Sequence, residues 1–234
     1  MSADKDQHYY QSHKLVLTRS AADCHAFAEE ILAINPRVDM VFSPILDIET
    51  VDFDIDSLHP DAALVTTSKN ADDMRRRFAN VPHYAIGGAP EIQDVAGLIK
   101  HIEAHHDKAR PLAYLRGHDI SFDLAHDLTQ KGYKIEEHIV YKANIAQAIT
   151  PECLAAIDAG HVAYISFFSA RTAAAFADLL PEAYHAKLKP IKALCLSAGV
   201  VNSLAKLPWQ DCLVTPNKTR AAMVELIQTL YESD

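Results

Sequence analysis

Two serines that each follow a buried strand pattern are the first residues with a potential for chemistry. Ser68 comes after Ala62–Thr66, and Ser169 comes after Val162–Phe167, in both cases where a helix is expected to begin. A serine at a helix N-cap accepts one backbone N–H, while the neighbouring amides and the positive end of the helix dipole can bind an anion. Capping alone explains either serine taken singly. The matched pair makes a carboxylate or phosphate site an equal alternative.

Each half of the chain also has a second strand that ends in small residues. These turns are Gly87-Gly88-Ala89 and Ser197-Ala198-Gly199, and their lack of bulky side chains lets a ligand approach the backbone. Neither turn has the G-x-G-x-x-G pattern of a dinucleotide site or the G-K-[ST] pattern of a phosphate loop, so a nucleotide is weakly supported. Tight-turn geometry explains the glycines about as well as ligand binding does.

Nucleophilic and metal-assisted catalysis have little support in the sequence. The G-x-S-x-G pattern of a serine hydrolase is absent. His101, His105 and His106 fall near helical spacing, but a zinc site needs three or four ligands with supporting partners, and none follows downstream. We therefore expect a solvated helix end and no metal. The catalytic candidates that remain are the single groups Tyr141, Arg19 and Arg116.

Composition narrows the partners and the compartment. The formal net charge is −9, with 31 acidic against 22 basic residues, whereas nucleic-acid binding depends on basic residues that neutralise phosphates. The densest basic run, Arg75–Arg77, spreads around a helix, so nucleic acid is not an expected partner. The sequence contains neither an apolar signal core nor a membrane-length apolar segment, and its four cysteines form no C-x-x-C pair. We expect a cytoplasmic protein without disulfides or membrane contact.

Short apolar runs alternate with amphipathic stretches, which predicts a parallel α/β architecture. The pattern restarts after Tyr141, and both halves run a buried strand into a serine and a second strand into a small-residue turn. The expected strands are 14–18, 38–42, 62–66, 83–86, 111–115, 162–167, 191–196 and 212–215, with 133–141 extended. The expected helices lie at 24–32, 69–78, 91–102, 119–130, 152–157, 171–180, 199–206 and from 218 onward.

In their order and spacing, these landmarks resemble the uroporphyrinogen-III synthase family over about residues 14–230. The matching segments are Leu15–Arg19, Thr67–Ala71, Tyr114–Gly117, Gly132–Ile135, Ile139–Lys142, Phe167–Ala173 and Leu196-Ser197. Each segment is short, and their common order makes the likeness specific. One departure concerns hydroxyl groups. The family often has a threonine after each small-residue turn, where this chain has Pro90 in the first turn and Gly199 or Val200 in the second.

The resemblance implies an α/β fold of two lobes, each a parallel sheet flanked by helices, joined by a two-stranded hinge. Lobe 1 would be discontinuous, made of residues 1–43 and 143–234 with an N-terminal arm at 1–13, and lobe 2 would span residues 44–142. The hinges are expected at Val38–Phe42 and Ile139–Ala143. The ligand is expected between the lobes.

The resemblance also implies a monomeric enzyme without cofactor or metal that closes linear hydroxymethylbilane, a polyanion, to uroporphyrinogen III. The last pyrrole ring is inverted and water is released. Tyr141 is the expected proton donor to the departing hydroxyl, because a phenol is protonated at neutral pH. The substrate carboxylates are expected at backbone amides and polar side chains of Arg19, Ser68, Lys69, Asn70, Gly87, Gly88, Ala89, Gly117, Ser169, Arg171, Ser197, Ala198 and Gly199.

Two other functions stay open at this point. One is a non-catalytic two-lobed protein that binds an anionic small molecule. The missing threonines favour it, and the retained Ser68, Ser169 and Tyr141 oppose it. The other is a nucleotide-dependent α/β enzyme, which the missing phosphate-loop patterns oppose.

Overall fold

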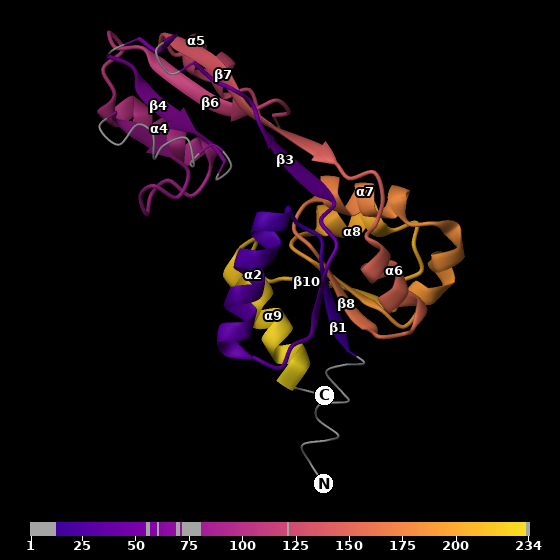
Figure 1. Ribbon diagram of the computed structural model, residues 1–234. Coiled ribbons are helices and arrows are strands. Elements are labelled where there is room, and N and C mark those ends of the chain that lie inside the picture. The colour runs from indigo at the N-terminus through magenta and orange to yellow at the C-terminus, as the bar shows by residue number, and fades with distance from the viewer. Residues whose placement is uncertain are drawn as a thin grey trace. The chain divides into compact units, whose positions relative to one another are not determined.

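The computed structural model describes residues 13–54, 57–59, 61–68, 71, 81–120 and 122–232. The chain divides into two compact units, which we call the first unit (Met1–Asp47 with Ile145–Asp234) and the second unit (Ile48–Asn144). Each unit has its own sheet with helices packed on it (Figure 1). None of the helices in the described ranges is both long and apolar enough to span a membrane.

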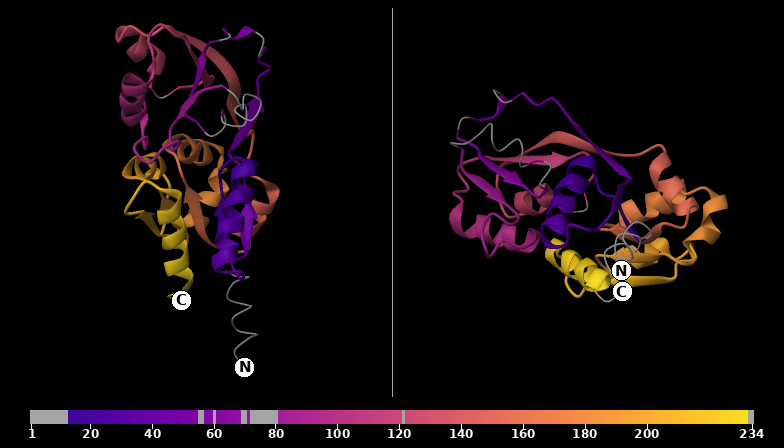
Figure 2. Two further views of the ribbon diagram at one scale, coloured as in Figure 1. Left: turned by 90° about the vertical axis from the view of Figure 1, so that its left-hand side faces the viewer. Right: turned by 60° about the horizontal axis from the view of Figure 1, so that its bottom comes forward.

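A five-stranded parallel sheet forms the centre of the first unit, in the order β10-β9-β8-β1-β2. Its strands are β1 (Lys14–Leu17), β2 (Met40–Phe42), β8 (Val162–Phe167), β9 (Lys192–Cys195) and β10 (Asp211–Val214). Helices α2 (Ala21–Ile34) and α9 (Arg220–Glu232) lie side by side on one face (Figure 1, Figure 2). The other face carries α6 (Pro151–Asp158), α7 (Ala170–Leu179) and α8 (Ala198–Leu204), and the 3₁₀ helix η3 (Glu182–Leu188) packs against α6.

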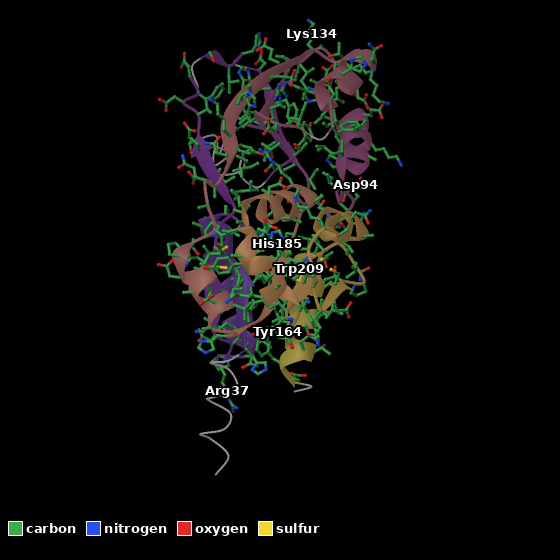
Figure 3. All side chains as sticks on the ribbon, turned by 90° about the vertical axis from the view of Figure 1, so that its right-hand side faces the viewer. Arg37, Asp94, Lys134, Tyr164, His185 and Trp209 are labelled. Carbon is green, nitrogen blue, oxygen red and sulfur yellow. The ribbon has the colours of Figure 1, made fainter. Side chains whose placement is uncertain are left out.

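The strands of this sheet read as continuous apolar runs because helices bury both of its faces. Leu15 and Leu17 belong to the core beneath α2 and α9, whereas Val16 between them belongs to the core beneath α6, α7 and α8. Trp209, labelled in Figure 3, packs edge-on against the Phe167 ring at a centroid distance of 5.9 Å on the second of these faces. The period of two along each strand therefore serves two cores at once.

The second unit is built on another five-stranded sheet, in the order β3-β7-β6-β4-β5. Its strands are β3 (Leu46–Thr50), β4 (Ala63–Thr66), β5 (His83–Ala85), β6 (Leu112–Gly117) and β7 (Ile135–Ile145), and β4 to β7 pair in parallel. Backbone bonds join Ala146 to Ile45 and Val51 to Val140, so numbers rise along β3 as they fall along β7, and this pair is antiparallel. Helices α4 (Val95–His105) and α5 (Leu124–Gln130) cover one face.

The first of the two expected hinges differs from the structure, whereas the second, Ile139–Ala143, lies within β7. Val38–Phe42, expected as a hinge, contributes β2 to the first sheet, where Val41 pairs with Val16. The chain passes from one unit into the other within β3 and β7. The run Leu46–Thr50 alternates in polarity as a strand does, yet it has no counterpart among the expected strands.

Two helices begin later than expected. The predicted start at Glu91 is wrong, because Asp94 caps α4 by accepting the N–H of Gly97 at 2.8 Å, and the helix begins at Val95. The predicted start at Asp119 is wrong, because Asp123 caps α5 by accepting the N–H of His126 at 2.9 Å, and the helix begins at Leu124. The expected helix at 69–78 lies outside the described residues apart from Ala71, and so does the expected N-terminal arm apart from His13. The expected fold class, two parallel-dominated sheets flanked by helices, is confirmed.

Candidate functional site

A pocket of about 290 Å³ lies in the second unit where β4 and β6 end and Tyr141 of β7 faces them. Open α/β sheets bind ligands outside this end of their strands. The lining combines hydroxyl, charged and apolar side chains: Thr67, Ser68, Ile86, Val95, Tyr114, Arg116, Gly117, Asp119, Ile120, Phe122, Leu124 and Tyr141. Three expected site residues, Ser68, Gly117 and Tyr141, are therefore brought together.

The ring of Tyr141 lies directly on the backbone of Gly117. A Cβ atom built on Gly117 would be 2.6 Å from Cζ of Tyr141 and 2.8 Å from its hydroxyl oxygen, closer than unbonded atoms pack. Gly117 ends β6 and is the register partner of Tyr141 in β7. Because any side chain at this position would occupy the space of the ring, the glycine determines where the phenol lies.

A second phenol, that of Tyr114, belongs to the same lining. It is buried, and its oxygen is 2.9 Å from the hydroxyl oxygen of Thr67. Burial raises the pKa of Tyr114, while the hydrogen bond to Thr67 and the charge of Arg116 partly offset the rise. Tyr114 is therefore neutral at physiological pH. The Thr67–Tyr114 pair gives the pocket wall uncharged hydroxyl groups.

Arg116, which is the cation among the described lining residues, already has partners within the protein. Its Nη1 donates to the carbonyl oxygens of Gly117 at 2.9 Å and His118 at 3.1 Å. Its Nε donates to Oε2 of Glu137 at 2.5 Å. These bonds tie the side chain to the end of β6 and to β7, so Arg116 links the parts of the backbone that line the pocket.

The loop between β6 and α5 adds an apolar rim. Ile120 and Phe122 are each 41% exposed and line the pocket. The late start of α5 makes this rim possible, because a helix from Asp119 would have turned these positions around its axis. Aromatic and aliphatic side chains beside a few polar groups are the usual lining of a small-molecule site.

The backbone amides of the small-residue turn after β5 are hydrogen-bonded within the turn itself. Gly87 donates to the carbonyl of Ile92 at 2.6 Å, and Gly88 donates to the carbonyl of Ala85 at 3.0 Å. Gly87 has φ +78°, in the left-handed region that favours glycine. Ala89 follows in the same turn. The structure thus gives the two glycines a role in forming the turn, and their binding of substrate stays a prediction.

The other expected residues that the structure describes lie in the first unit, at the carboxyl ends of the adjacent strands β1, β8 and β9. Ser169 is the N-cap of α7, where its Oγ accepts the N–H of Thr172 at 3.1 Å, as the sequence predicts. Arg171 follows it and is exposed. Ser197 precedes α8 without a capping bond from its side chain, and Ala198 and Gly199 in the first turn are exposed.

Arg19 has partners of its own at this edge. Its Nη2 is 2.9 Å from Oδ2 of Asp23, and its guanidinium lies 4.4 Å from the centroid of the Phe168 ring. Lys69 and Asn70 lie outside the described residues. The expected ligand position between the lobes stays a prediction.

Sequence reasoning missed Thr67 and Tyr114 as members of the site. Both fall in segments that carry the family resemblance, but an apolar strand pattern marks Tyr114 as core. Only the pairing of β4 with β6, in which Val65 is the register partner of Tyr114, brings the two hydroxyls together. Spacing along the chain contains no signal for this contact.

The end of α4 is less solvated than expected, because His105 is exposed but His106 is buried and His101 is half-buried. The rings of His101 and His105 are 4.2 Å apart, and Nδ1 of His101 is 3.1 Å from Oε1 of Glu91. Over the described part of the chain, no group of three or more His, Cys, Asp and Glu side chains is placed to hold a metal ion.

Comparisons with known proteins show which family the sequence matches. A family model described as uroporphyrinogen-III synthase HemD matches residues 84–225, more than half of the 234-residue chain. The chain has no match among the curated proteins. The crystal structure of uroporphyrinogen-III synthetase from Helicobacter pylori is similar with a TM-score of 0.59 at 18% identity, over 93% of this chain and 99% of that one.

Uroporphyrinogen III synthase from Thermus thermophilus is also similar, at 16% identity over 94% of this chain and 97% of that one, with a TM-score of 0.42. The Helicobacter pylori structure has the same α/β fold. The family model covers Gly117, Tyr141 and Ser169, three of the expected site residues. The chain belongs to the uroporphyrinogen-III synthase family.

Proposed function

We propose that the chain closes linear hydroxymethylbilane to uroporphyrinogen III with inversion of the last pyrrole ring and loss of water. The observation that carries the proposal is the family match over residues 84–225, which includes a tyrosine whose ring rests on Gly117 in the wall of a pocket. The first and second units would be the two expected lobes.

Tyr141 is the proton donor in this proposal. Departure of the substrate hydroxyl as water needs a proton and leaves a reactive azafulvene, which the substituted carbon of the last ring then attacks. The original bond from this carbon to its methylene bridge then breaks, and the methylene bonds to the free α-carbon of the same ring, which loses its proton. The proton consumed in the dehydration is thereby returned. No external nucleophile takes part, so a catalytic triad is not required. The protein supplies the rest of the catalysis by holding the flexible linear substrate in one conformation. The isomer that forms depends on which carbon of the last ring meets the azafulvene.

The substrate carboxylates need donors in an acidic protein. We assign this role to Ser68, Lys69, Asn70 and the Gly87–Ala89 turn in the second unit. In the first unit we assign it to the α7 start at Ser169 and Arg171, the residues 197–199 and Arg19. Helix starts and backbone amides suit carboxylates because their N–H groups and dipoles favour negative charge.

The compartment, the oligomeric state and the lack of cofactors belong to the same proposal. We infer a monomer that works in the cytoplasm without cofactor or metal. Dehydration followed by ring closure moves a proton and an electron pair within one substrate, so neither a redox group nor a second substrate is needed.

The first test is direct conversion. Purified protein is incubated with freshly generated hydroxymethylbilane, and isomers I and III are separated. We expect isomer III to predominate, whereas a sample without protein yields isomer I. Tight binding of hydroxymethylbilane without isomer III would contradict the proposal and would favour the non-catalytic binding protein.

Replacement of Tyr141 by phenylalanine tests the proton donor, because it keeps the ring and removes only the hydroxyl. General acids contribute about 10²–10⁴-fold, so even a partial role lowers the rate at least about tenfold with a nearly unchanged melting temperature. Tyr133→Phe is the matched control, since Tyr133 is a buried phenol of the same unit outside the pocket lining. Full turnover by Tyr141→Phe would exclude the assignment.

A further inference from the structure

We propose that Arg116 and Glu137 are positioning residues that set the place of the Tyr141 hydroxyl through the backbone of Gly117. The inference rests on the proposed function of Tyr141. In this proposal Arg116 binds the protein's own backbone carbonyls. An arginine in the site of a polyanionic substrate would ordinarily be expected to bind a substrate carboxylate.

The first step is the bond set of Arg116. Nη1 contacts the carbonyl oxygens of Gly117 at 2.9 Å and His118 at 3.1 Å, and Nε contacts Oε2 of Glu137 at 2.5 Å. The Arg116 side chain is only 16% exposed. A guanidinium is a rigid planar fork of donors, so these three bonds fix its plane and hold both carbonyls at once. One carboxylate already neutralises its charge.

The second step is the register of β6 and β7. Arg116 is the partner of Ile139, but Gly117 is the partner of Tyr141, so Val140 is an extra residue between two consecutive pairs. Such a bulge changes the direction of a side chain and needs local support. The N–H of His118 donates to the carbonyl of Tyr141 at 2.9 Å and closes the distorted stretch.

The third step links this backbone to the phenol. The Tyr141 ring sits where a Cβ of Gly117 would be, 2.6 Å from Cζ. Rotation of the Gly117 peptide would therefore move the surface on which the ring rests. Arg116 holds the Gly117 carbonyl, and Glu137 holds Arg116. The order of support thus runs from Glu137 through Arg116 and Gly117 to the Tyr141 hydroxyl.

Glu137→Gln distinguishes positioning from anion binding, because the first predicts a lower kcat and the second a lower KM. If Arg116 bound substrate, loss of the neighbouring carboxylate would free its charge and lower KM. If Arg116 positions Tyr141, the same change loosens the support and lowers kcat by at least about threefold with KM little changed, because small misplacement of a catalytic group is costly. A lower KM with an unchanged kcat would overturn the proposal.

Arg116→Lys gives a second measurement. Lysine keeps the positive charge but cannot bridge two carbonyls and a carboxylate in one plane, so we expect kcat to fall as in Glu137→Gln. In a Tyr141→Phe background, Glu137→Gln should change kcat by less than about twofold, because the two changes remove one effect. Equal fold-losses in both backgrounds would contradict action through the hydroxyl.

A readout without turnover keeps this inference separate from the proposed function. Ring-labelled tyrosine NMR, with the Tyr141 signal assigned from Tyr141→Phe, should show a shifted or broadened signal in Glu137→Gln. Glu103→Gln is the matched control, because Glu103 forms an exposed pair with Lys131 at 2.7 Å in the same unit outside the pocket lining. An unchanged Tyr141 signal in Glu137→Gln would refute positioning. If the wild type lacks synthase activity, the proposed function fails and the NMR result still decides the inference.

Discussion

Replacement of Gly117 by alanine adds one methyl group at the point where the Tyr141 ring touches the β6 backbone. The new Cβ would lie 2.6 Å from Cζ and 2.8 Å from both Cε2 and the hydroxyl oxygen of Tyr141. Unbonded carbon atoms pack at about 3.5–4.0 Å, so the ring must retreat by about 1 Å. The atoms that must move are the far end of a half-buried side chain, which can yield without a shift of the backbone.

The expected effect is therefore large on catalysis and small on stability. A misplacement of about 1 Å can cost about 100-fold in rate, so we expect kcat for isomer III to fall about 10- to 100-fold. Overpacking at a tight contact costs about 1–3 kcal/mol, and the freedom of the ring places this variant near the lower end.

The assay measures initial rates and the ratio of isomer III to isomer I with freshly generated hydroxymethylbilane, together with a thermal melt. Gly132→Ala is the control for lost stability in the same unit, because Gly132 is outside the pocket lining and nothing lies within 4 Å of a Cβ there. Its φ of +85° strains any side chain, so this variant should melt earlier with an unchanged kcat. The reasoning would be refuted if Gly117→Ala kept wild-type kcat and isomer ratio. A cooperative melt near the wild-type temperature with a low kcat would support it.

Two further predictions concern stability. Ser169→Ala removes the N-cap bond to Thr172 and should cost about 1 kcal/mol in urea unfolding, whereas Ser197→Ala should cost less because Ser197 makes no capping bond; equal losses would contradict the capping assignment. Burial lowers the pKa of His138 below its ordinary value of 6.5, and Glu136 only partly opposes this. The unfolded chain therefore binds this proton more readily, so the stability present above pH 6.5 is lost as the pH falls through the lowered pKa. His138→Phe should flatten this part of the urea-midpoint profile between pH 7.5 and 5.5, and an unaltered slope would rule out His138 as its source.

The sequence alone contains most of the information on the fold. Because both faces of the parallel sheets are buried, strands such as Leu112–Leu115 are apolar throughout, and the helices between strands carry one apolar stripe. Ser169 is likewise readable as a cap, since capping depends on residues three positions apart. Local patterns of this kind also support the family resemblance that the match over residues 84–225 confirms.

Elements whose position depends on a distant partner are harder to predict from the sequence. β3 is short and half exposed, and its place is decided by antiparallel bonds to β7, about a hundred positions along the chain. The start of α5 depends on whether Asp119 or Asp123 caps it, and both aspartates suit an N-cap by type.

The candidate site shows the same division. Ser68, Gly117 and Tyr141 can be selected from residue type, order and family resemblance. Strand order and a one-residue bulge produce the contacts of the site. They place Gly117 beneath the Tyr141 ring and Thr67 beside Tyr114. They also let Arg116 bond to two carbonyls and to Glu137. A shift of one residue in register turns a side chain to the opposite face of a sheet, so these contacts are decided by the pairing of strands and only the tertiary structure contains them.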